Sequence, residues 1–326
     1  MPATDLSVCI PSRNEKFLGR TVQSVLAAAE ADTECIIVLD GYWPAVPDPI
    51  YDHPKVTIIH VDQPVGQRGG VNMAASLSRA KYVMKLDAHC SVDQGFDRKL
   101  IADCEPDMTV IPRMHNLHVF DWLCTKCNAR YYQADPMESC PCGSREFIED
   151  LVWKPREGRG KTTDFMCFDH ELHFQYWYRY KNRPAAQGQV SDLMSSIGAC
   201  FFMERKRFWD LEGLDEAHGF WGQFGTEIAC KSWLSGGRHV VNKNTWFAHY
   251  FRVGKLKFPY HISGDAQERA RLYSRDLWLN NKWPKQIRPL SWLVEKFAPV
   301  KYWHDPVGTA ALANVLEAGK AFNGSR

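Results

Sequence analysis

An acidic residue and a histidine follow a short apolar run in the first third of the chain. Asp87 and His89 come directly after the run 82–86 and are separated by one residue. In an extended segment, residues i and i+2 project to the same side, so both side chains can bind one ion. An oxygen and an imidazole nitrogen together suit manganese better than calcium. The pair therefore predicts a divalent metal site, and the alternative is a turn capped by Asp87 with an exposed histidine.

Four cysteines further along the chain predict a second metal site of a different kind. They form a Cys-x-x-Cys and a Cys-Pro-Cys-Gly segment that enclose twelve residues, and they are Cys124, Cys127, Cys140 and Cys142. This spacing is typical of a tetrahedral structural zinc in a zinc ribbon. The second segment is one residue tighter than usual, so Cys167 or His170 could supply one ligand. The alternatives are four unrelated thiols or two disulfides.

The composition is that of one large globular domain, or of one domain with insertions. The chain has 326 residues, of which 24% are charged, and a formal charge of +2, so overall charge does not drive polyanion binding. The N-terminus shows no signal peptide, and no apolar run approaches the ~18 residues of a membrane span. Because most cysteines lie singly in apolar runs, we expect a reducing compartment. We predict a cytoplasmic protein without a membrane partner. If a bacteriophage encodes the protein, its compartment is the cytoplasm of the host cell.

The first hundred residues alternate short apolar runs with amphipathic segments. Strands are expected over 6–10, 35–39, 56–60 and 82–86, and helices over 18–29 and 71–80. Further strands are expected over 109–112 and 196–203, and a further helix over 266–278. The alternation predicts an α/β fold with a mixed, mostly parallel sheet flanked by helices.

Polar residues follow three of these strands, at the end of a parallel sheet where ligands bind. They are Asn14 and Glu15, then Asp40, and then Asp87. Neither a Gly-x-Gly-x-x-Gly turn nor a Walker motif follows the first strand, which argues against dinucleotide oxidoreductases and P-loop enzymes. A nucleotide can instead be bound by carboxylates and amides, with a metal neutralising its diphosphate.

Four segments occur in a characteristic order along the chain: Ile10-Pro-Ser-Arg-Asn-Glu15, Leu86-Asp-Ala-His-Cys90, Phe220-Trp-Gly-Gln-Phe-Gly-Thr-Glu227 and His249-Tyr-Phe-Arg252. With them, residues 5–280 resemble the GT-A (Rossmann-like) glycosyltransferases of the family 2 type, and especially the polypeptide N-acetylgalactosaminyltransferases. The resemblance implies a nucleotide-sugar donor, with a UDP-sugar expected, and transfer of a hexosyl or pentosyl group to a hydroxyl acceptor.

The resemblance also assigns roles to single residues. Manganese, or magnesium, would be bound by Asp87, His89 and His249. The catalytic residues would be Glu227, Trp221 and Arg252, the last adding charge to the phosphates from a loop that reaches about residues 254–260. The donor would be bound by nine residues: Pro11, Arg13, Asn14, Glu15, Asp40, Arg68, Lys85, Asp87 and Gly222.

One departure from the family bears on the mechanism. Inverting relatives carry a Glu-Asp pair whose Asp deprotonates the acceptor, and this pair would fall on Phe224 and Gly225. Neither residue accepts a proton, so we predict a retaining reaction in which the leaving diphosphate takes the acceptor proton. Alternatively, a shift of two residues places Glu227 in the base position. Phe224 also replaces an acid of the N-acetylgalactosaminyl relatives, which leaves the sugar open.

The expected organisation has four parts. Residues 1–120 form the half that binds the nucleotide sugar, and residues 121–190 form an inserted zinc ribbon with a basic and aromatic acceptor-side segment. Residues 191–265 form the acceptor and catalytic half, and residues 266–326 form a C-terminal helix and a wrapping tail.

Basic and aromatic residues are interleaved over 154–183. This pattern suits phosphate contacts and base stacking in a nucleic acid, and the alternative is a solvated flap whose aromatics pack on the ribbon. One candidate acceptor is a hydroxymethylated base in DNA, of the kind found in bacteriophages. Its rival is a Ser/Thr hydroxyl of a peptide, which the resemblance implies. Two other functions stay open: a nucleotidyltransferase and a non-catalytic zinc-ribbon adaptor.

Overall fold

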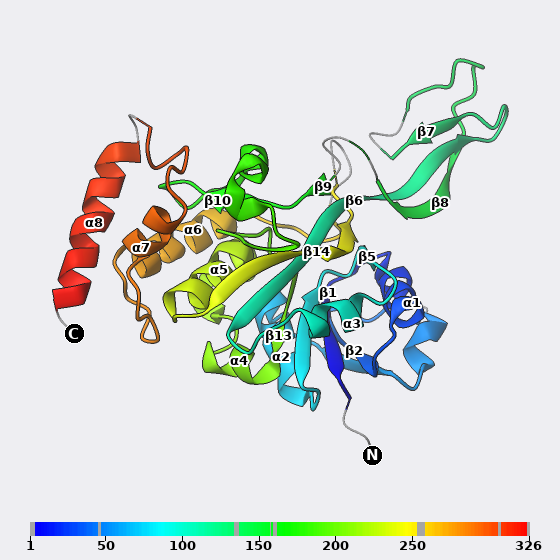
Figure 1. The fold of residues 1–326 in the computed structure, drawn as a ribbon. Coiled ribbons are helices and arrows are strands. Elements are labelled where there is room, and N and C mark those ends of the chain that lie inside the picture. Colours follow the sequence, from blue (N-terminus) through cyan, green and yellow to red (C-terminus); the bar gives the residue numbers. More distant parts are fainter. Residues whose placement is uncertain are drawn as a thin grey trace.

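A single mixed β-sheet forms the centre of the molecule (Figure 1). The computed structural model describes residues 4–44, 47–133, 137–156, 158, 162–252, 258–305 and 308–324. In spatial order, the main strands are β12 (Val190–Asp192), β14 (Arg238–His249), β6 (Met108–Cys124), β13 (Cys200–Glu204), β4 (Tyr82–Leu86), β1 (Leu6–Ser12), β2 (Thr33–Asp40) and β3 (Val56–Val61).

The mixed α/β sheet predicted from the sequence is confirmed. Its strands pair in parallel in two groups, one of four strands and one of two. The first four expected strands form the parallel block β3-β2-β1-β4, in which β1 and β2 are buried along almost their whole length. Beyond β4, β13 runs antiparallel to both of its neighbours, and only β6 and β14 pair in parallel. Parallel strands buried on both faces read as continuous apolar runs, which explains why their positions were easy to predict.

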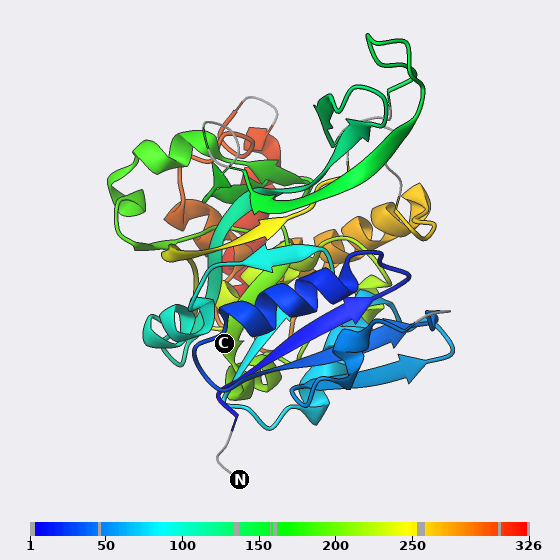
Figure 2. The same cartoon turned by 90° about the vertical axis from the view of Figure 1, so that its right-hand side faces the viewer.

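Helices cover both sides of the sheet (Figure 2). They are α1 (Leu18–Ala28), α2 (Gly66–Leu77), α3 (Phe96–Ala102), α4 (Arg205–Asp210), α5 (Phe224–Leu234), α6 (Gly264–Leu279), α7 (Leu290–Lys296) and α8 (Gly308–Gly324). Short 3₁₀ turns occur at η1 (Pro49–Asp52), η2 (Tyr178–Asn182), η3 (Pro184–Ala186) and η4 (Glu216–His218). No helix in the described part of the chain combines the length and the apolar character that crossing a membrane requires.

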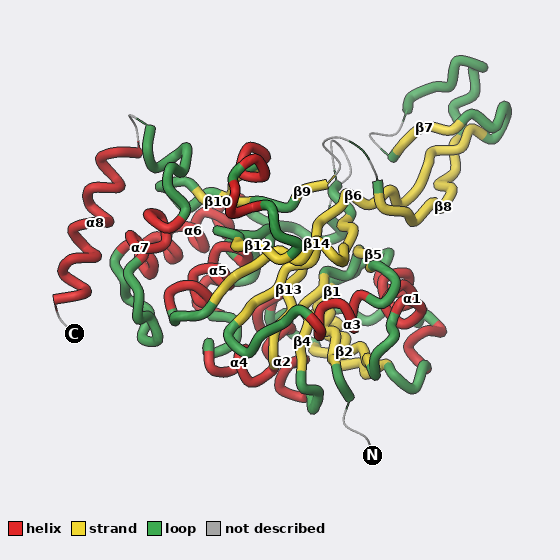
Figure 3. The backbone as a smooth tube through the Cα atoms, in the orientation of Figure 1, coloured by secondary structure: helices red, strands yellow, loops and turns green. Residues whose placement is uncertain are grey.

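Strand β6 extends well past the expected 109–112 and leaves the sheet. Its first half pairs with β14, and its second half pairs with β7 (Arg130–Tyr132) and β8 (Phe147–Pro155) in a projecting ribbon. Figure 3 shows this projection as strands and loops, whereas the chain after β14 is helical. The ribbon residues are only partly buried, so their pattern lacks the apolar run by which the other strands were recognised.

A small apolar cluster attaches the base of the ribbon to the sheet. Its buried members are Phe17, Leu117, Val119, Phe120, Ala248 and Tyr250. Tyr250 follows β14 directly, so the cluster places the ribbon beside the end of this strand. Three shorter strands complete the fold: β5 (Cys90–Val92) pairs with β14, β9 (Thr162–Thr163) pairs with β6, and β10 (Met166–Phe168) forms a hairpin with β11 (Phe174–Tyr176).

Candidate active site

A cavity of about 940 Å³ opens where β1, β2 and β4 end. Pro11 and Ser12 come from the end of β1, Asp40 from the end of β2, and Asp87 from the residue after β4. The opposite wall comes from the segment before α5 and from α6. The strand ends therefore meet at one site, as expected for an α/β sheet.

Asp87, His89 and His249 converge in this cavity. One ligand atom of each lies within 4.8 Å of those of the other two. The Nε2 atoms of the two histidines are 3.0 Å apart, and His249 Nε2 is 3.3 Å from Asp87 Oδ2. Asp87 and His89 lie in the turn between β4 and β5 rather than in an extended strand, and the pairing of His249 with Cys90 brings β14 alongside them.

Neighbouring side chains orient Asp87 and His89. Lys85 and Gln67 both donate to Asp87 Oδ1, which leaves Oδ2 directed at the histidines. Glu15 Oε2 lies 3.1 Å from His89 Nδ1 and 2.5 Å from the guanidinium of Arg252. A carboxylate on the far nitrogen of a histidine is the usual support of a metal ligand, because it fixes the ring orientation and the tautomer.

The protonation states also suit a metal. Burial disfavours ionisation of Asp87, but Lys85 and the two histidines outweigh it and lower the pKa of this carboxyl. Burial lowers the pKa of His249 to about 4, against an opposing effect of Asp87, so its ring is neutral at pH 7. One carboxylate, two imidazoles and an open cavity side fit a divalent ion such as Mn²⁺ that keeps positions free for a further ligand.

Most of the residues predicted to bind the donor line the cavity. They are Pro11, Arg13, Glu15, Asp40, Lys85, Asp87 and Gly222, and two residues predicted to be catalytic, Trp221 and Arg252, line it as well. Asp40, however, accepts hydrogen bonds from the backbone amides of Val65 (2.6 Å) and Gly66 (3.1 Å), so both of its oxygens cap the start of α2. Asn14 is exposed, has a φ of 53° and donates to the carbonyl of Pro259 instead of facing the cavity.

The structure corrects the expected placement of Arg68 and Glu227. Both side chains are buried, at 1% and 0% exposure, and Arg68 Nε donates to Glu227 Oε2 over 2.8 Å. The other guanidinium nitrogens of Arg68 donate to the carbonyls of Gly219 (3.0 Å) and Gly222 (2.8 Å). Neither residue is among those that line the cavity. Through these contacts they support the loop before α5.

Glu227 is held in the ionised form inside this network. Its Oε1 accepts a hydrogen bond from the backbone amide of Asp215 (2.6 Å) and lies 3.2 Å from Lys231 Nζ. Burial opposes its ionisation, but Arg68, Lys231 and His218 outweigh burial and lower the pKa of Glu227 to about 2. A carboxylate with so low a pKa and so many partners is a poor proton acceptor, which argues against the alternative in which Glu227 is the base.

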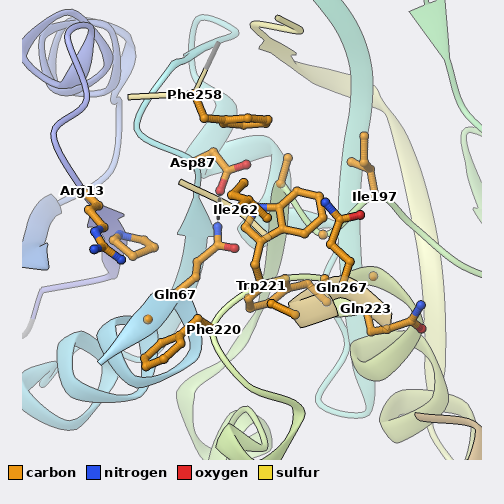
Figure 4. A pocket seen from close by; sticks show the side chains of 18 of the residues that line it. Arg13, Gln67, Asp87, Ile197, Phe220, Trp221, Gln223, Phe258, Ile262 and Gln267 are labelled. Carbon is orange, nitrogen blue, oxygen red and sulfur yellow. Dashed lines mark hydrogen bonds between the residues drawn. The ribbon is translucent and has the colours of Figure 1, made fainter. Parts of the chain in front are cut away.

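The loop that Arg68 and Glu227 support carries an aromatic face into the cavity. Figure 4 shows the Trp221 ring in the middle of this view, with Gln267 on one side and Asp87 and Gln67 on the other. The Phe258 ring meets Trp221 edge-on at 6.2 Å. An aromatic face of this kind suits the apolar face of a pyranose ring. Of the loop expected over 254–260, residues 254–257 lie outside the described residues.

Gln67 and the hairpin β10–β11 were not anticipated as parts of the site. Gln67 donates to Asp87 Oδ1 over 2.5 Å, and it directly precedes Arg68, which was singled out. In the hairpin, His173 and Phe174 line the cavity. Neither had a sequence signal of its own, because both contacts depend on how distant segments fold together.

The four ribbon cysteines also come together. Their Sγ atoms all lie within 4.8 Å of one another, with 3.6 Å between Cys124 and Cys142 and 3.5 Å between Cys127 and Cys140. Four thiolates ~2.3 Å from a zinc would stand roughly 3.8 Å apart, so the cluster fits a zinc-ribbon insertion. Cys167 is buried in β10 and His170 donates to the carbonyl of Tyr302, so neither belongs to the cluster.

The interleaved aromatics of 154–183 serve two purposes. Phe165, Phe168, Trp177 and Tyr180 are buried in the main core, whereas the packing alternative had placed the aromatics on the ribbon. Tyr176 and Tyr178 are instead exposed. Among the basic residues, Arg183 donates to the carbonyls of Phe297 and Pro299, whereas Arg159 and Lys161 lie outside the described residues.

Comparisons with known proteins identify the class to which this site belongs. Residues 7–118 match the family model described as "Glycosyl transferase family 2". The chain superimposes on GalNAc-T7, crystallised with UDP, GalNAc and Mn²⁺, with a TM-score of 0.59 and 16% identity, over 96% of this chain and 55% of the other. It also superimposes on TarS 1-349 of S. aureus in complex with UDP-GlcNAc. The TM-score is 0.50 and the identity 12%, over 97% of this chain and 81% of the other. The predicted GT-A type of fold is thereby confirmed.

Curated relatives point to one branch of this class. The chain is 26% identical over 309 residues to the putative polypeptide N-acetylgalactosaminyltransferase 13 of Drosophila melanogaster, covering 89% of this chain and 48% of the relative. It is 25% identical over 288 residues to polypeptide N-acetylgalactosaminyltransferase 10 of Homo sapiens, covering 84% and 42%. The chain thus spans about half the length of these relatives, which are glycosyltransferases, in agreement with the predicted enzyme class.

Proposed function

We propose that this protein is a metal-dependent glycosyltransferase that moves a sugar from a nucleotide sugar, with UDP as the nucleotide, to a hydroxyl group of a macromolecular acceptor. The observation that carries the proposal is the convergence of Asp87, His89 and His249 in the cavity at the strand ends. The family 2 domain and the UDP and Mn²⁺ bound to the structural neighbour GalNAc-T7 support it.

Asp87, His89 and His249 would hold Mn²⁺. When bound, the ion supplies a Lewis acid that neutralises charge on the diphosphate. Lys85 keeps Asp87 ionised, and Glu15 fixes the ring of His89. Arg252, next to Glu15, contributes a further positive charge on the same side of the cavity. Trp221 offers its face to the sugar, so that the anomeric carbon is held near the diphosphate.

We propose that the reaction retains the configuration of the anomeric carbon. Among the described cavity-lining residues, the carboxylates are Glu15, Asp40, Asp87 and Glu268. Each of these carboxylates already has a partner. Glu15 contacts His89 and Arg252, and Asp40 caps α2. Asp87 accepts from Lys85, and Glu268 pairs with Arg271. Because these carboxylates are engaged, none of them acts as the base in this proposal, and the bond from the anomeric carbon to the diphosphate oxygen breaks as the acceptor oxygen bonds that carbon. The acceptor proton then passes to the released diphosphate.

The remaining parts have supporting roles in this proposal. The ribbon cysteines hold a structural zinc, and residues 121–190 form the acceptor side, between a donor-binding half over 1–120 and a second half over 191–265. The C-terminal part over 266–326 closes the molecule and buries Trp278 and Trp303. A nucleotidyltransferase would bind a nucleoside triphosphate. A non-catalytic adaptor would bind neither a nucleoside triphosphate nor a nucleotide sugar.

The test is donor hydrolysis by the purified protein with Mn²⁺ and a panel of UDP-sugars. We expect release of UDP that depends on Mn²⁺ and on one preferred sugar, and we expect Asp87→Ala to abolish it. Asp210→Ala is the matched control, because Asp210 is half exposed on α4 and pairs with Lys206. Full turnover by Asp87→Ala contradicts the metal assignment, and turnover of nucleoside triphosphates instead of UDP-sugars favours the nucleotidyltransferase.

A further inference from the structure

The hairpin β10–β11 forms one wall of the cavity, and its turn is organised by a single carboxylate. Asp169 Oδ1 accepts hydrogen bonds from the backbone amides of Glu171 (2.9 Å) and His173 (2.8 Å). Asp169 Oδ2 lies 3.2 Å from Nδ1 of His173. The side chain of His173 is 53% exposed and faces the cavity that it lines. The turn therefore presents an oriented imidazole to whatever enters there.

Two cavity residues fix this turn to the rest of the site. Gln223, labelled in Figure 4, donates from Nε2 to the carbonyl of Leu172 over 3.1 Å. Arg271 donates to the carbonyl of Glu171 over 2.9 Å. Gln223 is the residue before α5, and Arg271 belongs to α6. The hairpin is thus positioned by the same two helices that bound the cavity opposite the strand ends.

Three aromatic rings lead away from the cavity along this hairpin. Phe174 lines the cavity, its ring meets that of Tyr176 edge-on at 4.9 Å, and Tyr176 stacks on Tyr178 at 5.7 Å with an interplanar angle of 18°. We call Phe174, Tyr176 and Tyr178 the aromatic strip. Tyr176 is 40% exposed and Tyr178 is 52% exposed, while Trp177 between them is buried. The outer two rings therefore present free faces to solvent.

Positive charge accompanies the strip. Arg179 and Lys181 follow Tyr178 directly in η2, are exposed, and form no ion pair with another residue in the described part of the chain. The nearby acid Glu171 is neutralised, because it pairs with Arg271 (3.0 Å) and Arg275 (2.8 Å). The surface beside the cavity thus combines open ring faces with uncompensated cations.

We propose that the aromatic strip, with Arg179 and Lys181, binds a single-stranded segment of nucleic acid that carries the acceptor hydroxyl into the cavity past His173. The proposal rests on the proposed function of this site. Nucleic acid offers both planar bases for the rings and phosphates for the two cations. A neutral glycan would use the rings but leave both cations without a partner, and a Ser/Thr peptide carries planar rings and negative charge only where its sequence includes aromatic and acidic residues.

The experiment measures binding of a fluorescent single-stranded DNA 12-mer to the full chain over a range of salt concentrations. Two phosphate contacts predict a slope of log K against log salt of about −1.4. Tyr176→Ala and Tyr178→Ala should each weaken binding about tenfold through the loss of one stacked base. Arg179→Ala should make the slope shallower by about 0.7.

Matched controls come from other surfaces of the molecule. Trp209→Ala removes a ring that is 39% exposed on α4, and Arg79→Ala removes an exposed cation just after α2. Both controls should leave the affinity and the slope unchanged. Equal losses in the controls and in the strip variants would overturn the proposal, because the binding would then come from unspecific surface contacts.

Donor hydrolysis, measured on the same samples, separates the two proposals. Mn²⁺-dependent hydrolysis without DNA binding at low salt overturns the nucleic-acid proposal and leaves the glycosyltransferase proposal standing. If a Ser/Thr peptide or a neutral oligosaccharide binds instead and depends on Tyr176 and Tyr178, the strip has another occupant and the proposal is wrong. DNA binding without hydrolysis of any donor contradicts the proposed function itself. Sugar transfer to a hydroxymethylated oligonucleotide that is lost in the strip variants supports both.

Discussion

At the scale of single residues, Glu15 links the predicted metal ligand His89 to Arg252. Its carboxylate touches both His89 and Arg252, and these two groups lower its pKa although burial opposes ionisation. We predict that Glu15→Gln lowers Mn²⁺ affinity about 10- to 100-fold, because the His89 ring loses its charged support. Titration of Mn²⁺ by calorimetry measures this, with the exposed Glu105→Gln as the control.

Arg68 and Glu227 give a second prediction at this scale. Breaking a buried ion pair leaves one charge without its partner, so Glu227→Gln should destabilise the protein by about 3–5 kcal/mol. The double variant Arg68→Met with Glu227→Met should recover much of this loss, yet it should bind UDP-sugar less well than UDP, because the loop that carries Trp221 loses its anchors. Urea unfolding and donor binding measure the two effects. A Glu227→Gln protein of normal stability but without turnover would instead indicate a catalytic acid or base.

These residues show what the sequence could reveal about the site and what it could not. Asp87 and His89 were accessible because they are two residues apart after an apolar run, and His249 only through the resemblance. The burial of Arg68 was not accessible, since its partners Gly219, Gly222 and Glu227 are about 150 residues away. Local sequence carries no record of such long-range partners.

At the scale of elements, β14 carries a buried histidine without a function in the cavity. His239 is fully buried, and burial lowers its pKa to about 3, with Asp192 acting in the opposite direction. In the unfolded chain, His239 therefore becomes protonated as the pH falls below about 6.5. In the folded chain, it stays neutral down to about pH 3. Stability is retained above pH 6.5 and falls by up to about 1.4 kcal/mol per pH unit below it.

We predict that His239→Leu flattens the decline of the free energy of unfolding between pH 6 and pH 4. The control is His60→Leu, which changes a histidine on the exposed strand β3. Chemical unfolding at several pH values measures both slopes. A decline in His239→Leu as steep as that of the unmodified protein would show that other groups govern acid stability.

The elements themselves were predictable where burial is complete. Strands β1, β2 and β4 were found because each is a buried, largely apolar run between turns, and β3 was found from its β-branched residues although it is only partly buried. The second half of β6 and most of β14 were missed. The second half of β6 lies in the half-exposed ribbon. Strand β14 is interrupted by the consecutive polar residues Asn242, Lys243 and Asn244, and such a polar run is typical of a loop. Pairing with distant strands, not local composition, makes these segments extended.

At the scale of the whole molecule, the ribbon and the cavity are joined by the cluster around Phe17 and Tyr250. We predict that the protein binds one zinc per chain through the ribbon cysteines and that Cys140→Ser removes it. The ribbon lacks a large core of its own, so zinc loss should unfold it and expose it to proteases, while the sheet stays folded. Zinc analysis with limited proteolysis measures this, and Cys104→Ser, outside the cluster, is the control.

Strand β6 constrains how such a protein can be cut and recombined. It passes from β14 to β8 between Asn116 and Leu117, without a break or a linker. Excising the ribbon at any position would thus cut strand β6 and expose the apolar cluster around Phe17 to solvent. Transplanting it into another scaffold would require part of the recipient's central sheet to travel with it. Domain boundaries drawn for engineering should accordingly not pass through this junction.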